Sequence, residues 1–360
     1  MSSCFPWLSW GYTLLLALVG GLLFKWFNLP VPWLLGPMIL IFIGSRLLRG
    51  RRLQLAWPAA ARDAGTIIVG YSLGLSLTFS TLSRIGQQLP SMIVMTVLLL
   101  LFSTATAYLI SRWTRIPFPT VLIGSIPGGL TQMVLLAQEL KGIDLTVVTF
   151  LQVSRLMMIV IFVPLLIFSP LFGVDLNTVT EAITHSSPGW SSLPPTIWLF
   201  VVVCPVAAVI GKRFNFPTAY MLLPMLVTAV IQLVGIPGPA LPASILDAAQ
   251  LMIGSSIGLM LHPEQLERKL QMTILAVGSG VVLLSFACVM SIILIQWHHL
   301  TPATALLSMA PGGMDQMGII AHEVSADIAT VSCYQLFRTL LIFLAVPTFL
   351  RMFIRRISMH

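Results

Sequence analysis

The chain has 360 residues, of which 57% are hydrophobic and only 8% are charged, and its mean hydropathy is +0.98. This composition excludes an ordinary soluble globular protein and indicates an all-α polytopic membrane protein. The net charge of +8 is not a sign of nucleic-acid binding, because membrane proteins carry a surplus of Lys and Arg on their cytoplasmic side.

Twelve apolar segments of spanning or near-spanning length follow one another, six in each half of the chain. They fall at residues 8–27, 31–48, 64–80, 90–111, 120–138, 145–168, 196–211, 218–235, 247–262, 272–296, 303–321 and 328–350. Between the halves lies a stretch rich in Ser and Pro and free of Lys and Arg. We therefore expect a first membrane repeat at 1–168, an external linker at 169–195 and a second membrane repeat at 196–360.

The second half repeats motifs of the first. The sequence Pro-Gly-Gly-Leu-Thr-Gln-Met at 127–133 returns as Pro-Gly-Gly-Met-Asp-Gln-Met at 311–317. Downstream, matched pairs are Glu139 and Glu323, Asp144 and Asp327, Gln152 and Gln335, and Arg155 and Arg338. A repeat of about 184 residues is far longer than a solenoid unit, so we interpret the chain as a duplicated domain.

The distribution of basic residues favours opposite orientations for the two repeats. If each Pro-Gly-Gly segment enters and leaves the membrane on the same face, each half crosses five times and the second half is inverted. One side then collects fifteen basic residues and the other keeps only Lys25 and Arg84, as the positive-inside rule expects. The fifteen are Arg46, Arg49, Arg51, Arg52, Arg62, Arg112, Arg115, Lys141, Lys212, Arg213, Arg268, Lys269, Arg351, Arg355 and Arg356.

Pro-Gly-Gly inside an apolar segment predicts a broken helix, since Pro removes a hydrogen bond and Gly disfavours the helix. Exposed backbone at that depth is tolerated only where protein or a water-filled cavity surrounds it. The second half-helix then points its N–H groups and positive dipole end into the protein, where an anion can bind. A close helix contact that needs small residues is the structural alternative. The candidate substrate-binding residues here are Gly128, Gly129, Gln132, Gly312, Gly313, Asp315 and Gln316.

Each half also carries an Arg inside its last apolar segment, with a Gln three residues earlier on the same helical face. These residues are Gln152 and Arg155 in the first half and Gln335 and Arg338 in the second. An ionisable residue within a membrane span is a candidate for function, so we add all four to the substrate site. The alternative is an internal ion pair with a nearby acid; the coupling or ion-pair candidates are Glu139, Glu323, Asp144 and Asp327.

Three other matched sets have structural interpretations. Asp63 and Asp247 open their apolar segments and are predicted to be helix N-caps. Pro37 and Pro224 indicate either a second pair of broken helices or a simple kink. Glycines at 70 and 74, and at 254 and 258, have the small-xxx-small spacing of helix-packing sites.

The doubled Pro-Gly-Gly motif with its Gln-Met, the Ala-x-Glu and Asp that follow, and the Gln-x-x-Arg of the next segment together resemble the AbrB-type membrane protein family, which has a duplicated domain. The resemblance covers nearly the whole chain. It implies a bacterial inner-membrane protein, and members are described as regulators of gene expression or as ammonia monooxygenases. The family is also distantly similar in architecture to secondary transporters of the cation-antiporter and bile-acid-symporter kinds, which have inverted repeats and broken helices.

The residues argue against both of those descriptions. The chain has no recognition helix or basic arm for DNA, and six scattered histidines do not supply the ligand cluster of a metal-dependent oxygenase. No nucleophile elbow, phosphate loop or metal-ligand spacing indicates an enzyme, so we expect neither a catalytic residue nor a bound metal or cofactor.

The sequence therefore predicts a secondary transporter or permease of the bacterial cytoplasmic membrane, with both termini cytoplasmic. Its substrate would be a small anionic or zwitterionic solute bound at the paired Pro-Gly-Gly segments. The alternatives are a membrane-embedded sensor that affects gene expression and, less favoured, a membrane monooxygenase. The expected partners are the lipid bilayer and a small-molecule or ion substrate; a homo-oligomer is left open, and no nucleic acid is expected.

Overall fold

A computed structural model describes residues 6–48, 55–114, 116–128, 130–139, 142–169, 194–214, 216, 218–260 and 269–357. Within these ranges the secondary structure is helical throughout and contains no β-strand. Several expected features lie outside them. These are nearly all of the linker, Gly129, and the basic residues Arg49, Arg51, Arg52, Arg115, Lys141 and Arg268.

Six helices in the described residues are long and apolar enough to cross a membrane. The qualifying stretches are Ser9–Trp26, Gly86–Thr114, Leu145–Ile167, Ala243–Met260, Gln271–His298 and Ile328–Val346. Many large apolar side chains on them face outward, such as Leu101 (61% exposed) and Ile274 (64% exposed). Apolar side chains exposed in this number are expected where the solvent is lipid, so the chain is a multi-pass membrane protein.

The chain packs as two compact units, and each unit takes segments from both halves of the sequence. Unit 1 contains residues 1–82, 164–261 and 318–329, and unit 2 contains 83–163, 262–317 and 330–360. The predicted repeats describe where the sequence recurs, whereas the units describe which segments pack together. The repeat boundaries at 168 and 196 therefore stay a prediction.

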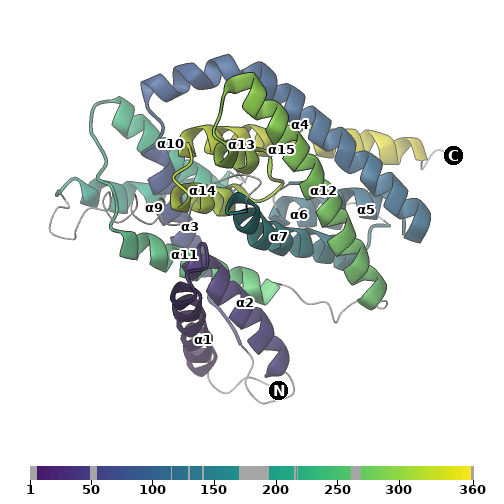
Figure 1. Ribbon diagram of the computed structural model, residues 1–360, viewed down its shortest axis with the longest axis horizontal. Coiled ribbons are helices and arrows are strands. Elements are labelled where there is room, and N and C mark those ends of the chain that lie inside the picture. The colour runs from purple at the N-terminus through teal and green to yellow at the C-terminus, as the bar shows by residue number, and fades with distance from the viewer. Residues whose placement is uncertain are drawn as a thin grey trace. The chain divides into compact units, whose positions relative to one another are not determined.

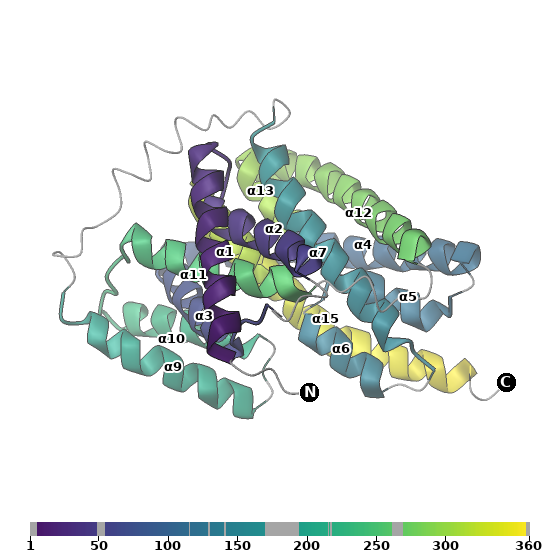
Figure 2. The ribbon, with the colours of Figure 1, turned by 90° about the horizontal axis from the view of Figure 1, so that it is seen from below.

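Unit 1 contains the first three helices of each half. They are α1 (Pro6–Trp26), α2 (Pro32–Leu47) and α3 (Ala59–Gly74), then α9 (Ile197–Arg213), α10 (Ala219–Leu233) and α11 (Ala243–Met260). Adjacent helices pair within each half: α1 lies against α2, and α9 lies against α10 (Figure 1 and Figure 2). The halves also pack crosswise, α2 on α11 and α10 on α3.

Glycines make this crosswise packing possible. Gly70 and Gly74 of α3 approach the backbone of α10 at Met221 and Met225. Gly254 and Gly258 of α11 approach the backbone of α2 at Leu34 and Met38 in the same way. A side chain at any of these four positions would collide with a carbonyl oxygen, so the helix-packing role predicted from the small-xxx-small spacing is confirmed.

Unit 2 contains the remaining helices of each half, in matching order. They are α4 (Phe79–Thr114), α5 (Phe118–Ser125), α6 (Leu130–Glu139) and α7 (Leu145–Ile167), then α12 (Lys269–His298), α13 (Pro302–Met309), α14 (Met314–Glu323) and α15 (Ile328–Ile357). The boundary between the units falls within α14. The helix ends between α5 and α6 and between α13 and α14, at the two Pro-Gly-Gly motifs.

Polar and aromatic contacts hold α4, α12 and α15 together in unit 2. The hydroxyl of Ser91 lies 2.8 Å from the Tyr334 hydroxyl and 2.8 Å from Nε2 of His298. The rings of Phe102 and Phe286 stack with their centroids 3.9 Å apart. These three helices therefore form a framework around the shorter broken segments.

Two of the sequence predictions are corrected by the helix bounds. Pro37 and Pro224 lie inside the continuous helices α2 and α10, so the alternative of a second pair of broken helices is wrong. Asp63 and Asp247 lie four residues inside α3 and α11 rather than before them. The N-cap prediction for these two Asp residues is therefore also wrong, because each helix starts a turn earlier than the apolar run indicated.

Candidate functional site

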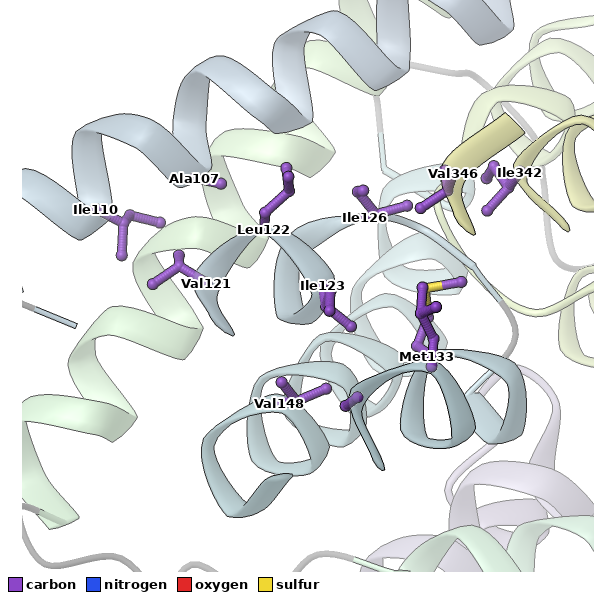
Figure 3. Close-up of a cluster of buried hydrophobic side chains, with 12 residues drawn as sticks. Ala107, Ile110, Val121, Leu122, Ile123, Ile126, Met133, Val148, Ile342 and Val346 are labelled. Carbon is purple, nitrogen blue, oxygen red and sulfur yellow. The ribbon is translucent and has the colours of Figure 1, made fainter. Parts of the chain in front are cut away.

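The first helix break lies in a well-packed part of unit 2. α5 ends at Ser125 and α6 begins at Leu130, with Pro127 and Gly128 between them. Figure 3 shows Val121, Leu122 and Ile123 of α5, Ile126 at the break, Met133 of α6, and Ile342 and Val346 of α15 in one buried cluster. Unpaired backbone at this break is thus surrounded by protein, as a chain in a membrane requires.

A buried Gln and a buried Arg on α7 bind the end of α5. The Gln152 amide nitrogen donates to the carbonyl oxygens of Ile123 at 2.6 Å and Ile126 at 3.1 Å. The Arg155 guanidinium donates to the carbonyl oxygens of Ser125 at 3.1 Å and Ile126 at 2.9 Å, and to Oε1 of Gln152 at 2.6 Å. A cation placed at the C-terminal end of a helix satisfies free carbonyls and complements the negative dipole end.

The second half repeats this arrangement with α15 and α13. The Gln335 amide nitrogen donates to the carbonyl oxygens of Leu307 at 2.6 Å and Ala310 at 3.1 Å. Arg338 donates to the carbonyl oxygens of Met309 at 3.3 Å, Ala310 at 2.9 Å and Gly312 at 3.4 Å, and also to Oε1 of Gln335. Both Gln–Arg pairs therefore fix the carbonyl ends of the first half-helices.

The two breaks face the last helix of the opposite half. A Cβ atom on Gly128 would lie 3.2 Å from Ile342 of α15, and one on Gly312 would lie 3.2 Å from Ile159 of α7. The nearest atom to the added Cβ would be Cε of Met133 or of Met317, at 2.8 Å in each case, so side chains cover both glycines closely. Both breaks belong to unit 2. Within this unit, the break of each half packs against the last helix of the other half.

The positive charges of the two arginines are not matched by a nearby carboxylate among the described residues. Arg155 is 7% exposed and Arg338 is 3% exposed, and their guanidinium groups repel one another. Their hydrogen-bond partners are carbonyl oxygens and the two Gln side chains, and no carboxylate among the described side chains bonds to either Arg. Two like charges are therefore buried together, and Nε of Arg155 is left without a hydrogen-bond partner.

The start of α14 presents a further unsatisfied group. Gln316, in its first turn, is 3% exposed, and its Oε1 atom is buried without a hydrogen-bond partner. Gln316 and Asp315 both turn back over Gly313, where an added Cβ would meet their side-chain oxygens. The glycine therefore leaves room for these two side chains in their present positions.

Some predicted site residues lie elsewhere or outside the described residues. The side chains of Gln132 and Glu139, on α6, lie outside the part of the chain that the structure describes. Asp144 is exposed and accepts hydrogen bonds from the backbone N–H groups of Thr146 and Val147, and Asp327 accepts one from Ala329. Both Asp residues therefore act at the N-terminal ends of α7 and α15.

Glu323 is the last residue of α14 and belongs to unit 1, where it accepts a hydrogen bond of 2.7 Å from Gln250. Its hydrogen-bond partner within unit 1 is therefore an amide.

Comparison with known proteins decides the family. The family model described as "Transition state regulatory protein AbrB" matches residues 42–354. The chain belongs to the AbrB family. A protein of Escherichia coli (strain K12) named "Putative regulator AbrB" is 32% identical over 346 residues, which cover 96% of this chain and 97% of that protein. "Uncharacterized protein YhjN" of Bacillus subtilis (strain 168) is 25% identical over 352 residues, which cover 92% of this chain and 90% of that protein.

In this AbrB-family chain, sequence comparison of the halves found the Gln–Arg pairs because both copies keep them. It missed Gln250, the partner of Glu323, because the corresponding position in the first half is Thr66. It also assigned Asp247 to a cap rather than to a charged group near Glu323. The sequence did contain a signal for this pair: Gln250 is a polar residue within an apolar run and lies one helical turn after Asp247.

Proposed function

We propose that this protein is a secondary transporter or permease of the cytoplasmic membrane for a small anionic or zwitterionic solute. The proposed site is formed by the two Pro-Gly-Gly breaks of unit 2 and by Arg155 and Arg338. The observation that carries the proposal is the burial of these two guanidinium groups at the breaks without a carboxylate partner among the described residues.

The summed charge of the two arginines, Asp315 and the four half-helix ends favours an anionic ligand. A buried charge without a partner costs several kcal/mol. The C-terminal ends of α5 and α13 supply only about −0.5 charge each, and the N-terminal ends of α6 and α14 return about +0.5 each. With Asp315 in the first turn of α14, roughly one positive charge remains among the described groups. A monovalent carboxylate, or the carboxylate of an amino acid, matches that remainder.

Gln316 supplies a group that selects among anions. Its amide is 97% buried and its carbonyl oxygen is unpartnered at the start of a half-helix. A ligand with an anionic group for the arginines and a hydroxyl or ammonium donor for this oxygen would satisfy both. Half-helix ends of this kind recur at the substrate sites of transporters built from broken helices.

The proposal is tested by charge movement in proteoliposomes. The purified protein is adsorbed on a solid-supported membrane and challenged with acetate, lactate, succinate, phosphate, glycine and glutamate, against protein-free liposomes. We expect a transient current with at least one small carboxylate or amino acid. Responses equal to those of protein-free liposomes for every solute would overturn transport of this class.

Variants then locate the site. Arg338→Met should lower the current at least tenfold, whereas Arg112→Met, at an exposed position on α4, should retain it. Gln316→Leu is the sharper variant, because replacing an unpartnered buried amide with an apolar side chain is neutral or stabilising for the fold. We expect Gln316→Leu to keep its melting temperature and to need a higher solute concentration for half-maximal current. An unchanged concentration would remove Gln316 from the site.

The alternative function is a membrane-embedded sensor that affects gene expression through a partner. The name of the Escherichia coli relative, "Putative regulator AbrB", favours this alternative. A sensor would bind the same solutes without moving them. Solute-dependent stabilisation of the purified protein without any current would therefore support the sensor, and we assign no catalytic role in either case.

A further inference from the structure

A small cavity lies within unit 1. It is lined by residues of α3, α11 and the second part of α14, and its polar lining comes from Ser72, Gln250 and His322. Its volume is about 10 Å³. That is the space of a single water molecule or monatomic ion, so the cavity is too small for an organic solute.

Gln250 is the side chain that indicates a ligand in this cavity. It is 2% exposed, and its Nε2 donates to Oε1 of Glu323 at 2.7 Å. Its own Oε1 is buried and has no hydrogen-bond partner. Leaving a carbonyl oxygen buried and unpaired costs about 1–3 kcal/mol. Since the amide nitrogen already bonds to Glu323, the amide oxygen is the atom available to bind a ligand.

Two acidic side chains and one basic side chain lie near this amide. Asp247 lies one helical turn before Gln250 on the same face of α11, and its carboxylate interacts electrostatically with Glu323 and with Lys25. Two carboxylates and one ammonium group sum to a single negative charge when all three are ionised. A ligand that neutralises these three ionised side chains therefore carries one positive charge.

We infer that Asp247, Gln250 and Glu323 form a binding site for a monovalent cation of the sodium class. Carboxylate and amide oxygens are hard ligands that suit alkali and alkaline-earth ions rather than transition metals. Among the described residues, no group of three or more His, Cys, Asp and Glu side chains gathers as a metal site. The net charge favours a monovalent ion over Ca²⁺ or Mg²⁺, and the cavity admits one ion.

The first half does not contain this site. Thr66 stands at the position of Gln250, and its hydroxyl already donates to the carbonyl oxygen of Arg62 at 2.8 Å. Gln138 stands at the position of His322. Asp63 and Glu139 recur, but the amide that joins the acids in the second half is missing. The inference therefore concerns one cation site, in the second half of the chain.

Cation-dependent stability of the purified protein tests this inference. Melting temperatures are measured in detergent with sodium, lithium, potassium or choline chloride at equal ionic strength and pH. Because a ligand that binds only the folded state stabilises it, we expect sodium to raise the melting temperature by several degrees over choline. Equal melting temperatures in all four salts would overturn the inference.

Variants assign the effect to the named residues. Gln250→Leu, Glu323→Gln and Asp247→Asn should each lose the sodium shift, while Asp144→Asn, at an exposed helix N-terminus, should keep it. Melting in choline shows whether each variant is folded. A sodium shift that survives in Gln250→Leu contradicts the site.

A measurement that needs no variant is scintillation-proximity binding of radioactive sodium to the wild-type protein. Absence of saturable binding would contradict the inference. Both readouts are independent of transport, so they can succeed or fail separately from the proposed function.

Discussion

Gly254→Ala should weaken the packing of α11 on α2 by a predictable amount. A Cβ atom on Gly254 would lie 2.4 Å from the carbonyl oxygen of Leu34, whereas ordinary van der Waals contact begins at 3.4 Å. The two helices must therefore separate by about 1 Å, and forced overpacking of this kind costs about 1–3 kcal/mol. The obstacle is backbone, which cannot turn aside as a flexible side chain can.

The matched control is Gly11→Ala on α1. An added Cβ there would meet nothing within 4 Å, so only the better helix propensity of Ala acts, a gain of about 1 kcal/mol. That gain is shared by both variants. The difference between their unfolding free energies therefore isolates the collision, and we expect Gly254→Ala to be the less stable by about 1–3 kcal/mol.

The assay is thermal unfolding of the purified proteins in the same detergent, followed by intrinsic tryptophan fluorescence. A difference of this size corresponds to a melting temperature lower by several degrees for Gly254→Ala. Gly70→Ala, with a Cβ 2.5 Å from the carbonyl oxygen of Met221, should behave the same way at the exchanged contact. Equal stability of Gly254→Ala and Gly11→Ala would refute the crosswise packing of unit 1.

Three further substitutions have expected effects on the same melting assay. Asp144→Ala should destabilise by about 1 kcal/mol because α7 loses its N-terminal acceptor, while Asp144→Asn should be close to wild type; equal effects would exclude the capping role. Tyr71→Phe removes the hydroxyl that donates to the carbonyl oxygen of Pro239 at 2.6 Å and should cost about 1–2 kcal/mol; a neutral result would mean that water replaces this bond. Thr218→Gly should stabilise by up to about 1 kcal/mol, because Thr218 has a φ of 47° and makes no side-chain capping bond; a loss of stability would show that its contacts outweigh the strain.

The order of helices was predictable from the sequence because lipid imposes a simple rule. A span must be long, apolar and helical, so each apolar run became a helix or a pair of helices. Helix starts were less predictable. α3 and α11 begin four residues before Asp63 and Asp247, because the helices include residues 59–62 and 243–246, which lie outside the apolar runs assigned from the sequence.

The site was predictable only where both halves carry the same residues. Arg155 and Arg338 were identified because the motif that contains them occurs in both halves. The sequence did not indicate that they would bind carbonyl oxygens of an earlier helix rather than an acid. That outcome depends on which helix end lies within reach of the guanidinium, a matter of packing. Gln250 has no counterpart in the first half, and its importance follows only from the atoms around it.

Everything proposed for the broken segments depends on the two halves being inserted in opposite orientations. Gly142 and Ser325 occupy matching positions after the second half-helices, and both have a positive φ, 81° and 52°. Each is replaced by Cys in a chain without its native cysteines, and intact cells are treated with a membrane-impermeant thiol reagent. We expect Ser325→Cys to be labelled and Gly142→Cys to be protected until the membrane is permeabilised. Labelling of both from outside would mean that each half crosses six times in parallel, and would contradict the inverted site.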